Sequence, residues 1–341
     1  MQGALGRTRI AMSSIASEAK QGASKELVFF FNDNQKVQLP DGHKFPMDKY
    51  RRTRDILEAE YADRSNLIFR ESPMATIDEL LTTHCPDYVN RFLTGTMTER
   101  EIRVSGFPWT EKGVKRALTS VGGTIAATRY VMDNGGIGSG AVSAHLAGGT
   151  HHAMYAHAEG FCIFSDIAVA ANLALKEYPE LKKILIIDCD VHQGNGNAVL
   201  FKEDERVVTF SMQCEGNIFS KKQQSDVDVD LPIGVGDVEY LAKLRSWLAP
   251  FLMDIVKPDL VFFQSGVDSS EFDRLGKLKM TREGLRTRNA LIYTAVKRRG
   301  IPLVVTMGGG YPKSLDPQSE AFQSVIGAHA DVYKQIVEHY G

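Results

Sequence analysis

The segment ILIIDCDVHQGNG, residues 184–196, joins an apolar run to polar side chains whose spacing could support chemistry. Asp188, Asp190 and His192 follow one another at every second position. Alternate side chains of an extended chain point to the same face, so Asp190 and His192 would converge where the strand ends. A carboxylate and an imidazole placed together can bind a divalent metal ion. An ordinary ion pair that caps the strand is the other interpretation, and these two residues alone do not decide between them.

A catalytic zinc ion usually has about three protein ligands and one position open to water. Asp268, in QSGVDSSEFD, is the candidate third ligand because it lies two residues after Gly266, at the end of another apolar run. A loop acid that caps the next turn is its alternative role. Two carboxylates and one imidazole, without a thiolate, suit Zn²⁺ and also Fe²⁺.

Two adjacent histidines, His151 and His152, stand in the segment GGTHHAMYAHAEGFC. Imidazoles transfer protons readily near neutral pH, so one could deprotonate water while the other supplies charge. A histidine that acts as a base needs an acceptor on its other ring nitrogen, and Asp188 and Asn195 are the candidate acceptors. Because one acceptor is charged and the other neutral, the two histidines should titrate differently. The alternative is a turn that carries two exposed histidines.

The segment MGGGYPK, residues 307–313, places a tyrosine after three glycines. Glycines permit positive φ and a close approach of the backbone. The phenol of Tyr311 could donate a hydrogen bond to a substrate oxygen on which negative charge develops. A glycine turn with a packing tyrosine is the alternative, and the segment lacks the Lys-Ser/Thr ending of a phosphate-binding loop.

An alternation of short apolar runs and helical patterns must position these side chains. The predicted strands are Leu27–Phe31, Leu67–Phe69, Ala141–Leu146, Ile184–Asp188, Val207–Met212, Val227–Leu231, Leu260–Gln264 and Leu303–Thr306. The predicted helices include one that Thr76 and Glu79 cap, one that Ser165 caps, and the stretches Val238–Val256, Thr281–Gly300 and Ser319–His339. This order predicts a single α/β domain with a central, mostly parallel sheet of about eight strands flanked by helices. Ligands of such sheets bind beyond the carboxyl ends of the strands, where the polar clusters follow ILII, LVFFQ and LVVT.

Composition narrows the class of protein. The chain has 341 residues and a formal net charge of −2, which excludes a globally basic surface for nucleic acid. No apolar run approaches the roughly 18 residues of a membrane span. Four cysteines without a CxxC pair indicate reduced thiols in a reducing compartment. We expect residues 1–24 to be a disordered tail, or a weakly transit-like segment, before a domain over residues 25–341. The protein would then be cytoplasmic or nuclear, or organellar if that segment directs import.

Five motifs in order, GGTHHA, GFCIFSD, IDCDVHQGNG, SGVDSSEFDRLG and GGGY, resemble the zinc-dependent histone deacetylase family. The resemblance extends from about Leu27 to the last predicted helix. Within the family, DVHQGNG, DRLGKL and HKFPM most resemble class IV deacetylases and their bacterial relatives. The resemblance implies an arginase/deacetylase-like fold and hydrolysis of acylated lysine in a protein or peptide. From the net charge and the lack of a long apolar run, we expect no direct nucleic-acid or membrane partner.

The resemblance also implies a role for each candidate residue. It implies Zn²⁺ on Asp190, His192 and Asp268, pairing of Asp188 with His151 and of Asn195 with His152, a Tyr311 that polarises the acyl carbonyl, and a substrate tunnel formed by Gly160, Phe161 and Phe219. It implies one K⁺ site around Asp188, Asp190, His192, Ser211 and Met212, largely through backbone carbonyls, and a second near Phe201, Asp204 and Val207. Many members carry Asp where Asn195 stands, and Asn there does not abolish activity in the family. One departure matters: the segment SGFPWTEKG has no clear match to the acidic rim residue that grips the substrate backbone.

Three rival functions remain open at the level of the sequence. The substrate could be a long-chain acyl-lysine or a small acylated amine such as a polyamine. The chain could be a scaffold that binds acyl groups without hydrolysing them, which would predict missing ligands. An arginase-type manganese enzyme would instead require an acid-rich, two-metal cluster.

Overall fold

Eight parallel strands form one sheet in the order β2-β1-β3-β8-β7-β4-β5-β6. The computed structural model describes residues 26–341, so the expected tail at residues 1–24 lies outside the described residues. The strands are β1 (Leu27–Phe31), β2 (Leu67–Glu71), β3 (Val142–His145), β4 (Ile184–Asp188), β5 (Val207–Cys214), β6 (Val227–Leu231), β7 (Leu260–Gln264) and β8 (Leu303–Thr306). All eight predicted strands are present, although β2 and β5 end two residues later than predicted and β3 is shorter.

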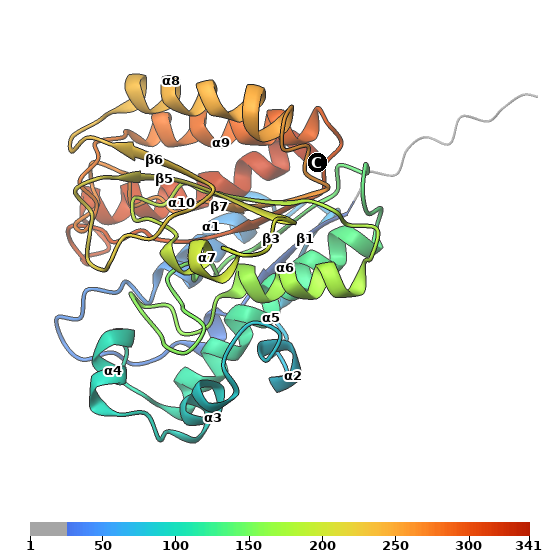
Figure 1. Cartoon of the computed structure of the whole chain (residues 1–341). Helices are drawn as coiled ribbons and strands as arrows, with labels where there is room; N and C mark the ends of the chain where they lie inside the picture. The colour runs from blue at the N-terminus through green and yellow to red at the C-terminus, as the bar shows by residue number, and fades with distance from the viewer. Residues whose placement is uncertain (1–25) are drawn as a thin grey trace, which may run out of the picture.

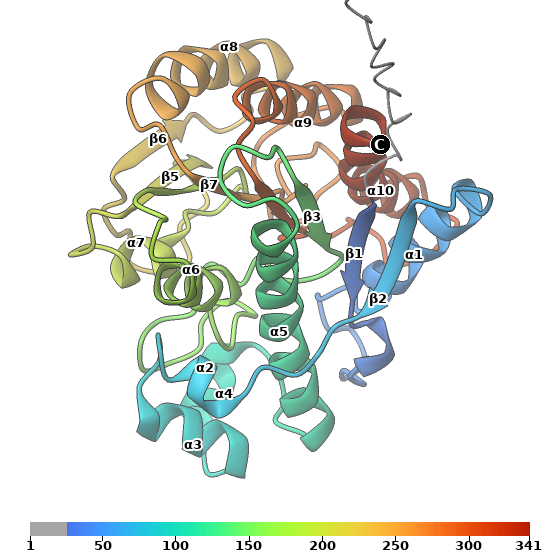
Figure 2. The same ribbon diagram turned by 90° about the vertical axis from the view of Figure 1, so that its right-hand side faces the viewer.

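Helices cover both faces of the sheet (Figures 1 and 2). On one face lie α1 (Lys49–Glu60), α8 (Asp237–Trp247), α9 (Arg282–Lys297) and α10 (Glu320–Tyr340). On the other lie α5 (Glu111–Asp133), α6 (Asp166–Glu177) and the shorter α2 (Ile77–Leu80), α3 (Pro86–Thr94), α4 (Glu99–Ser105) and α7 (Asn195–Leu200). Leu27 and Phe29 pack into the first layer, whereas Val28 and Phe30 pack into the second. Burial on both faces explains why the strands are nearly continuous apolar runs.

Hydroxyl side chains begin the helices where the sequence predicts. Thr76 forms the full capping box with Glu79, and Ser165 accepts a hydrogen bond from the amide of Ala168. Thr281 and Ser319 cap α9 and α10 in the same way. The prediction of one helix over Val238–Val256 was wrong in its second half, because α8 ends at Trp247 and a π-helical turn, η2 (Leu248–Met253), follows. Pro250 lies in that turn, where it has no amide hydrogen for the α-helical bond.

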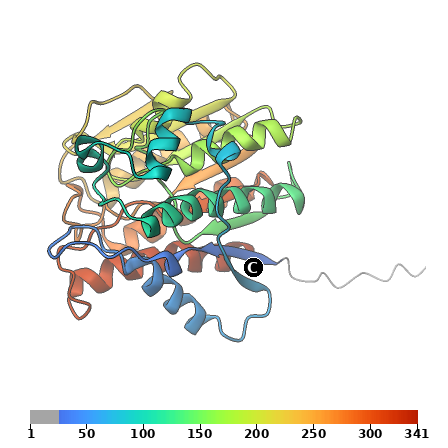
Figure 3. The same cartoon turned by 90° about the horizontal axis from the view of Figure 1, so that it is seen from below.

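The long helix α5 was not predicted, and two central glycines explain why its pattern is weak. A Cβ atom at Gly122 would lie 2.0 Å from the carbonyl oxygen of Pro73. A Cβ atom at Gly123 would lie 2.4 Å from both His145 Nε2 and Ser72 Oγ. Glycine lowers helix propensity, but here it lets α5 lie directly against β3 and the end of β2. Figure 3 shows α5 and α6 side by side, in green and yellow-green, in front of the sheet.

The sheet order brings four strand ends together. The strands β3, β8, β7 and β4 are consecutive neighbours, and all of them are parallel. Their carboxyl ends therefore meet at one edge, and each leads into one of the motifs singled out from the sequence. Among the described residues, no helix has both the length and the apolar character needed to cross a bilayer.

Candidate active site

Asp190, His192 and Asp268 converge at this edge of the sheet. The potential ligand atoms of the three side chains lie within 4.8 Å of one another. His192 Nδ1 is 3.1 Å from Asp190 Oδ1 and 3.2 Å from Asp268 Oδ2. The convergence follows from the register, because Asp188 pairs with Gln264 and both chains continue beyond that pair into the site.

Glycine backbone surrounds the two carboxylates closely. The Gly309 amide donates to Asp190 Oδ2 at 2.8 Å, and the Val191 amide donates to Asp268 Oδ1 at 2.8 Å. A Cβ atom at Gly309 would lie 2.2 Å from Asp268 Oδ2 and 2.6 Å from Asp190 Oδ2. The glycines that follow β8 therefore allow the backbone to pack closely against the carboxylates of Asp190 and Asp268.

The donor set fits a divalent metal ion. Asp190 and Asp268 are fully buried, and the side chain of His192 is only 12% exposed. Burial, reinforced by the charge of Asp190, raises the pKa of Asp268 to about 8. A cation among the three side chains would offset the cost of burying two carboxylates so close together. Two carboxylates with one imidazole match the ligands that Zn²⁺ or Fe²⁺ accepts.

The two adjacent histidines lie beside this cluster, with ring centroids 3.9 Å apart. His151 Nδ1 is 2.6 Å from Asp188 Oδ2, and His152 Nδ1 is 2.6 Å from Asn195 Oδ1. Both rings are buried, at 3% and 4% exposure, so the alternative of a turn with exposed histidines is wrong. The pairing with one charged and one neutral acceptor is the one that the family resemblance implies.

The electrostatic surroundings separate the two imidazoles. Burial acts to lower the pKa of His151, but the carboxylates of Asp188 and Asp190 outweigh it and raise that pKa to about 9. For His152, burial and the nearby charges of His151 and His192 lower the pKa well below 6.5. At neutral pH this arrangement favours a charged His151 beside a neutral His152.

Tyr311 is held by the loop that follows β7. Its amide donates to Asp273 Oδ2 at 2.5 Å, and its carbonyl oxygen accepts from the amide of Arg274 at 2.8 Å. The carboxylate of Asp273, 2% exposed, also accepts from the amides of Leu275 and Gly276. Asp273 stands in the DRLG motif, but nothing in the local sequence indicated its role. Its function is to brace one loop against the other.

Aromatic rings border a pocket that reaches the two histidines and Tyr311. The Phe161 ring lies 5.9 Å from that of Tyr311. Phe219 is 51% exposed, and its ring lies 4.7 Å from that of His152. Between them, a Cβ atom at Gly160 would lie 2.8 Å from His152 Cδ2.

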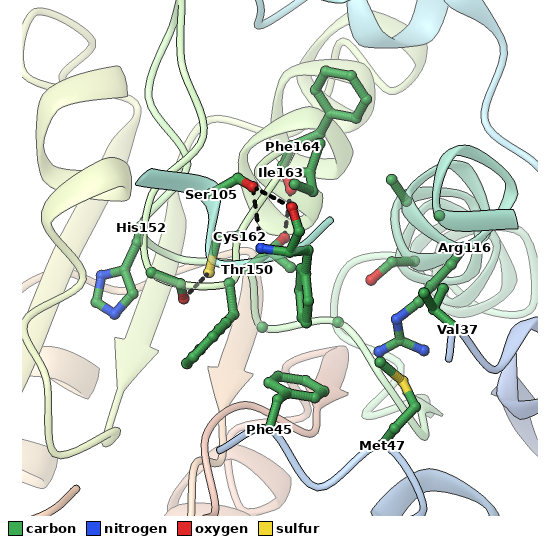
Figure 4. Close-up of a pocket in the computed structure, with 18 of the residues that line it drawn as sticks. Val37, Phe45, Met47, Ser105, Arg116, Thr150, His152, Cys162, Ile163 and Phe164 are labelled. Carbon is green, nitrogen blue, oxygen red and sulfur yellow. Dashed lines mark hydrogen bonds between the residues drawn. The ribbon is translucent and has the colours of Figure 1, made fainter. Parts of the chain in front are cut away.

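The same pocket extends beyond the two histidines and Tyr311, and Figure 4 shows Phe45, Met47 and Arg116 around another part of it. Its inner lining includes Lys49 and Arg116 and the apolar side chains of Phe92, Met97, Ile102 and Trp109. Lys49 Nζ donates to the Gly308 carbonyl oxygen at 2.8 Å and lies 5.4 Å from the Tyr311 ring centroid. Burial lowers the pKa of Lys49 to about 8. No sequence motif pointed to these residues of the inner pocket, which come from helices and from the loops around α4, far from the strand ends in the chain.

The residues expected near potassium lie on β5 and after α7. Ser211 pairs with Asp188 across the sheet, and Ser211 Oγ accepts from the Gly194 amide at 3.2 Å. Met212 is fully buried beside it. In the second group, the Phe201 carbonyl accepts from the Asp204 amide at 3.0 Å, and the Asp204 carbonyl accepts from the Val207 amide at 3.1 Å.

Comparison with known proteins gives a consistent result. Residues 43–327 match the family model of the histone deacetylase domain. The chain is 39% identical over 296 residues to an uncharacterized protein of Picosynechococcus, covering 86% of this chain and 95% of that protein. It is 28% identical to Histone deacetylase 2 of Arabidopsis thaliana, covering 80% of this chain and 70% of that protein. It is also 28% identical to acetoin utilization protein AcuC of Staphylococcus aureus, covering 86% and 78%.

A solved structure, the HD domain of HDA15, has the same fold. It superposes with a TM-score of 0.74 at 21% identity and covers 93% of this chain and 90% of its own. The sheet, the order of the motifs and the matched family model agree. The chain therefore belongs to the histone deacetylase family and, as a member, is a hydrolase of the deacetylase type.

Proposed function

We propose that this protein hydrolyses acyl-lysine amides with the help of a bound Zn²⁺ ion. One observation carries the proposal: the cluster of Asp190, His192 and Asp268 adjoins a pocket that the histidine pair and Tyr311 line. A lysine side chain could enter between Phe161 and Phe219, which would bring its amide to these groups. Fe²⁺ would fit the same three ligands.

Each side chain then has a defined task. When bound, the metal ion would polarise the acyl carbonyl and acidify a water molecule. His152 accepts the water proton at Nε2, because burial keeps its ring neutral and Asn195 occupies Nδ1. His151, held by Asp188, contributes positive charge until a proton returns to the leaving amine. The Tyr311 hydroxyl donates a hydrogen bond to the carbonyl oxygen as negative charge grows there.

The same proposal includes two K⁺ sites and the assignment of the chain to class IV of the family. The backbone around Ser211 and Met212 supports the first K⁺ site, and the backbone near Phe201 and Asp204 supports the second. The class IV assignment depends on the DVHQGNG, DRLGKL and HKFPM motifs. A reducing compartment agrees with four cysteines that form no disulfide.

The inner pocket favours a second candidate, the removal of long acyl chains. Phe92, Met97, Ile102 and Trp109 give the space beyond the catalytic side chains an apolar lining. An acetyl group would leave this space unfilled, whereas a longer chain would bury apolar surface in it. A small acylated polyamine would instead depend on contacts at the opening.

One experiment separates these candidates. The purified protein is analysed for bound metal and assayed on lysine peptides that carry acetyl, octanoyl or myristoyl groups, and on an acetylated polyamine. We expect one equivalent of Zn²⁺ or Fe²⁺ and hydrolysis of at least one acyl-lysine peptide, abolished by a chelator. Stable, metal-free protein that hydrolyses none of them would favour an acyl-binding scaffold and refute the proposal.

A further inference from the structure

We propose that Glu159 is a positioning residue that sets the orientation of the Asn195 amide and, through it, the ring of His152. The inference rests on the proposed function, in which His152 is the general base. Glu159 acts through Asn195 and is not itself a catalytic residue.

Two consecutive hydrogen bonds connect the side chains of Glu159, Asn195 and His152. Asn195 Nδ2 donates to Glu159 Oε2 at 3.0 Å, while Asn195 Oδ1 lies 2.6 Å from His152 Nδ1. Asn195 and His152 are 3% and 4% exposed, whereas Glu159 lies partly exposed at the end of the chain. On His151 the corresponding hydrogen bond goes directly to a carboxylate, that of Asp188, with no amide between them.

An amide needs such a partner, because it can turn over and present either its oxygen or its nitrogen. An ionised carboxylate only accepts hydrogen bonds, so Glu159 attracts the NH₂ group of Asn195 and repels the oxygen. The oxygen must then face His152 Nδ1, which has to carry the ring hydrogen in order to donate. His152 Nε2 is left with a free lone pair toward the pocket, as a general base requires.

A carboxylate in place of Asn195 would need no such help, since both of its oxygens accept. Glu159 is therefore the compensation for a neutral residue at position 195. Among the described residues, Glu159 takes part in no ion pair, so its carboxylate has no cationic partner that would explain its position.

The turn that carries Glu159 is held in an unusual conformation. Residues 159–162 form a tight turn in which the Cys162 amide donates to the Glu159 carbonyl at 2.8 Å. Gly160 and Phe161 both have positive φ, +54° and +68°. A phenylalanine in this region has a strained backbone. The same strained turn places Phe161 against the pocket and Glu159 against Asn195, and such strain is concentrated at functional sites.

Kinetics of full-length, Zn²⁺-loaded variants test the inference on the best substrate of the acyl panel. Glu159→Ala should lower kcat on the order of 10-fold, as loss of an outer hydrogen-bond partner does, with little change in KM. Glu159→Gln keeps an oxygen that can accept from Asn195 and should recover most of the rate. Glu271→Ala, which removes an exposed carboxylate from the loop after β7, is the matched control and should leave kcat unchanged.

The decisive comparison repeats Glu159→Ala in an Asn195→Asp background. There the new carboxylate accepts from His152 directly and is repelled by Glu159, so removing Glu159 should leave kcat unchanged or raise it. A role of Glu159 in merely holding the turn would lower kcat by the same factor in both backgrounds. Equal losses, or no loss in the native background, would overturn the inference.

A readout without turnover keeps this test separate from that of the proposed function. In protein labelled with ¹⁵N-histidine, we expect the native His152 ring to show one tautomer, protonated at Nδ1, and Glu159→Ala to show a mixture. An unchanged spectrum in Glu159→Ala would contradict the inference even if the native protein hydrolysed no substrate. Active native protein with equal spectra would refute the role of Glu159 alone.

Discussion

At the scale of single residues, the site is built on differences between chemically similar groups. His151 and His152 are neighbours in the chain and in space, yet one faces a carboxylate and the other an amide. The carboxylates raise the pKa of the first ring, while burial and neighbouring charge lower that of the second. The difference in pKa therefore arises from the surroundings of the two rings rather than from their chemistry, which is the same.

The hydroxyl of Tyr311 should matter far more for turnover than for stability. Tyr311→Phe removes one hydrogen-bond donor to the developing negative charge, so kcat should fall on the order of 10²–10³-fold. The ring would keep its packing against Phe45 and Phe161, at 6.0 and 5.9 Å between centroids. Steady-state kinetics, bound metal and the unfolding midpoint check this. A variant with native kcat would remove the phenol from the mechanism.

Loss of one carboxylate should release the metal ion. Asp268→Asn keeps an oxygen that can accept from the Val191 amide but removes the charge. Because an uncharged amide is a poor ligand beside a single remaining carboxylate, we expect metal content well below one equivalent and no detectable turnover. Metal analysis after dialysis is the measurement, with the exposed Asp316→Asn as control. Full metal occupancy in Asp268→Asn would assign the ion to other ligands.

At the scale of elements, α5 shows how packing overrides helix propensity. Alanine is intrinsically better than glycine in a helix by roughly 1 kcal/mol. Gly122→Ala should nevertheless lower the free energy of unfolding by about 1–3 kcal/mol, because its Cβ would lie 2.0 Å from the Pro73 carbonyl. Urea unfolding checks the sign, with Lys115→Ala on the exposed face as control. A stabilised Gly122→Ala protein would contradict the packing argument.

The same elements show what the sequence could and could not predict. The buried strands were found because residues such as Ile184 and Leu260 begin unbroken apolar runs, and the capped helices because Ser165 and Thr281 mark their starts. The helix α5 was missed because Gly122 and Gly123 weaken its local signal, and their purpose lies in distant contacts with Pro73 and His145.

The candidate site also contains residues that the sequence could predict and residues that it could not. Side chains at strand ends, such as Asp190 and Asp268, lie in motifs whose order along the chain can be read. The contribution of Glu159 depends on a turn with positive φ, and that of Lys49 on the approach of α1 to the loop after β8. Both are contacts between segments far apart in the sequence, for which no local pattern exists.

At the scale of the whole molecule, one continuous sheet orients every group of the site. The strands β3, β4, β7 and β8, which lead into the motifs, are spread along the chain from Val142 to Thr306, yet they are neighbours in the sheet. Helices on both faces bury these strands, so the side chains at the strand ends are positioned by the packed core. Stability and site geometry are therefore linked, and conditions that weaken the core should disturb both.

Acid should weaken the whole fold through buried neutral histidines, and His84 offers the cleanest test. Its ring is 1% exposed, its Nε2 accepts from the Ser165 amide, and burial lowers its pKa to about 4. As pH falls below 6.5, His84 becomes protonated in the unfolded chain but stays neutral in the folded protein down to about pH 4. The free energy of unfolding therefore decreases across that window. Between pH 7.5 and 5 this one group should account for a loss of about 2 kcal/mol. His84→Gln keeps an acceptor for Ser165 but does not titrate, so it should lose less stability over the same interval. Urea unfolding of both proteins measures the difference, with both saturated with Zn²⁺ so that metal binding contributes equally. Equal losses of unfolding free energy in the two proteins would show that His84 is not the neutral group described.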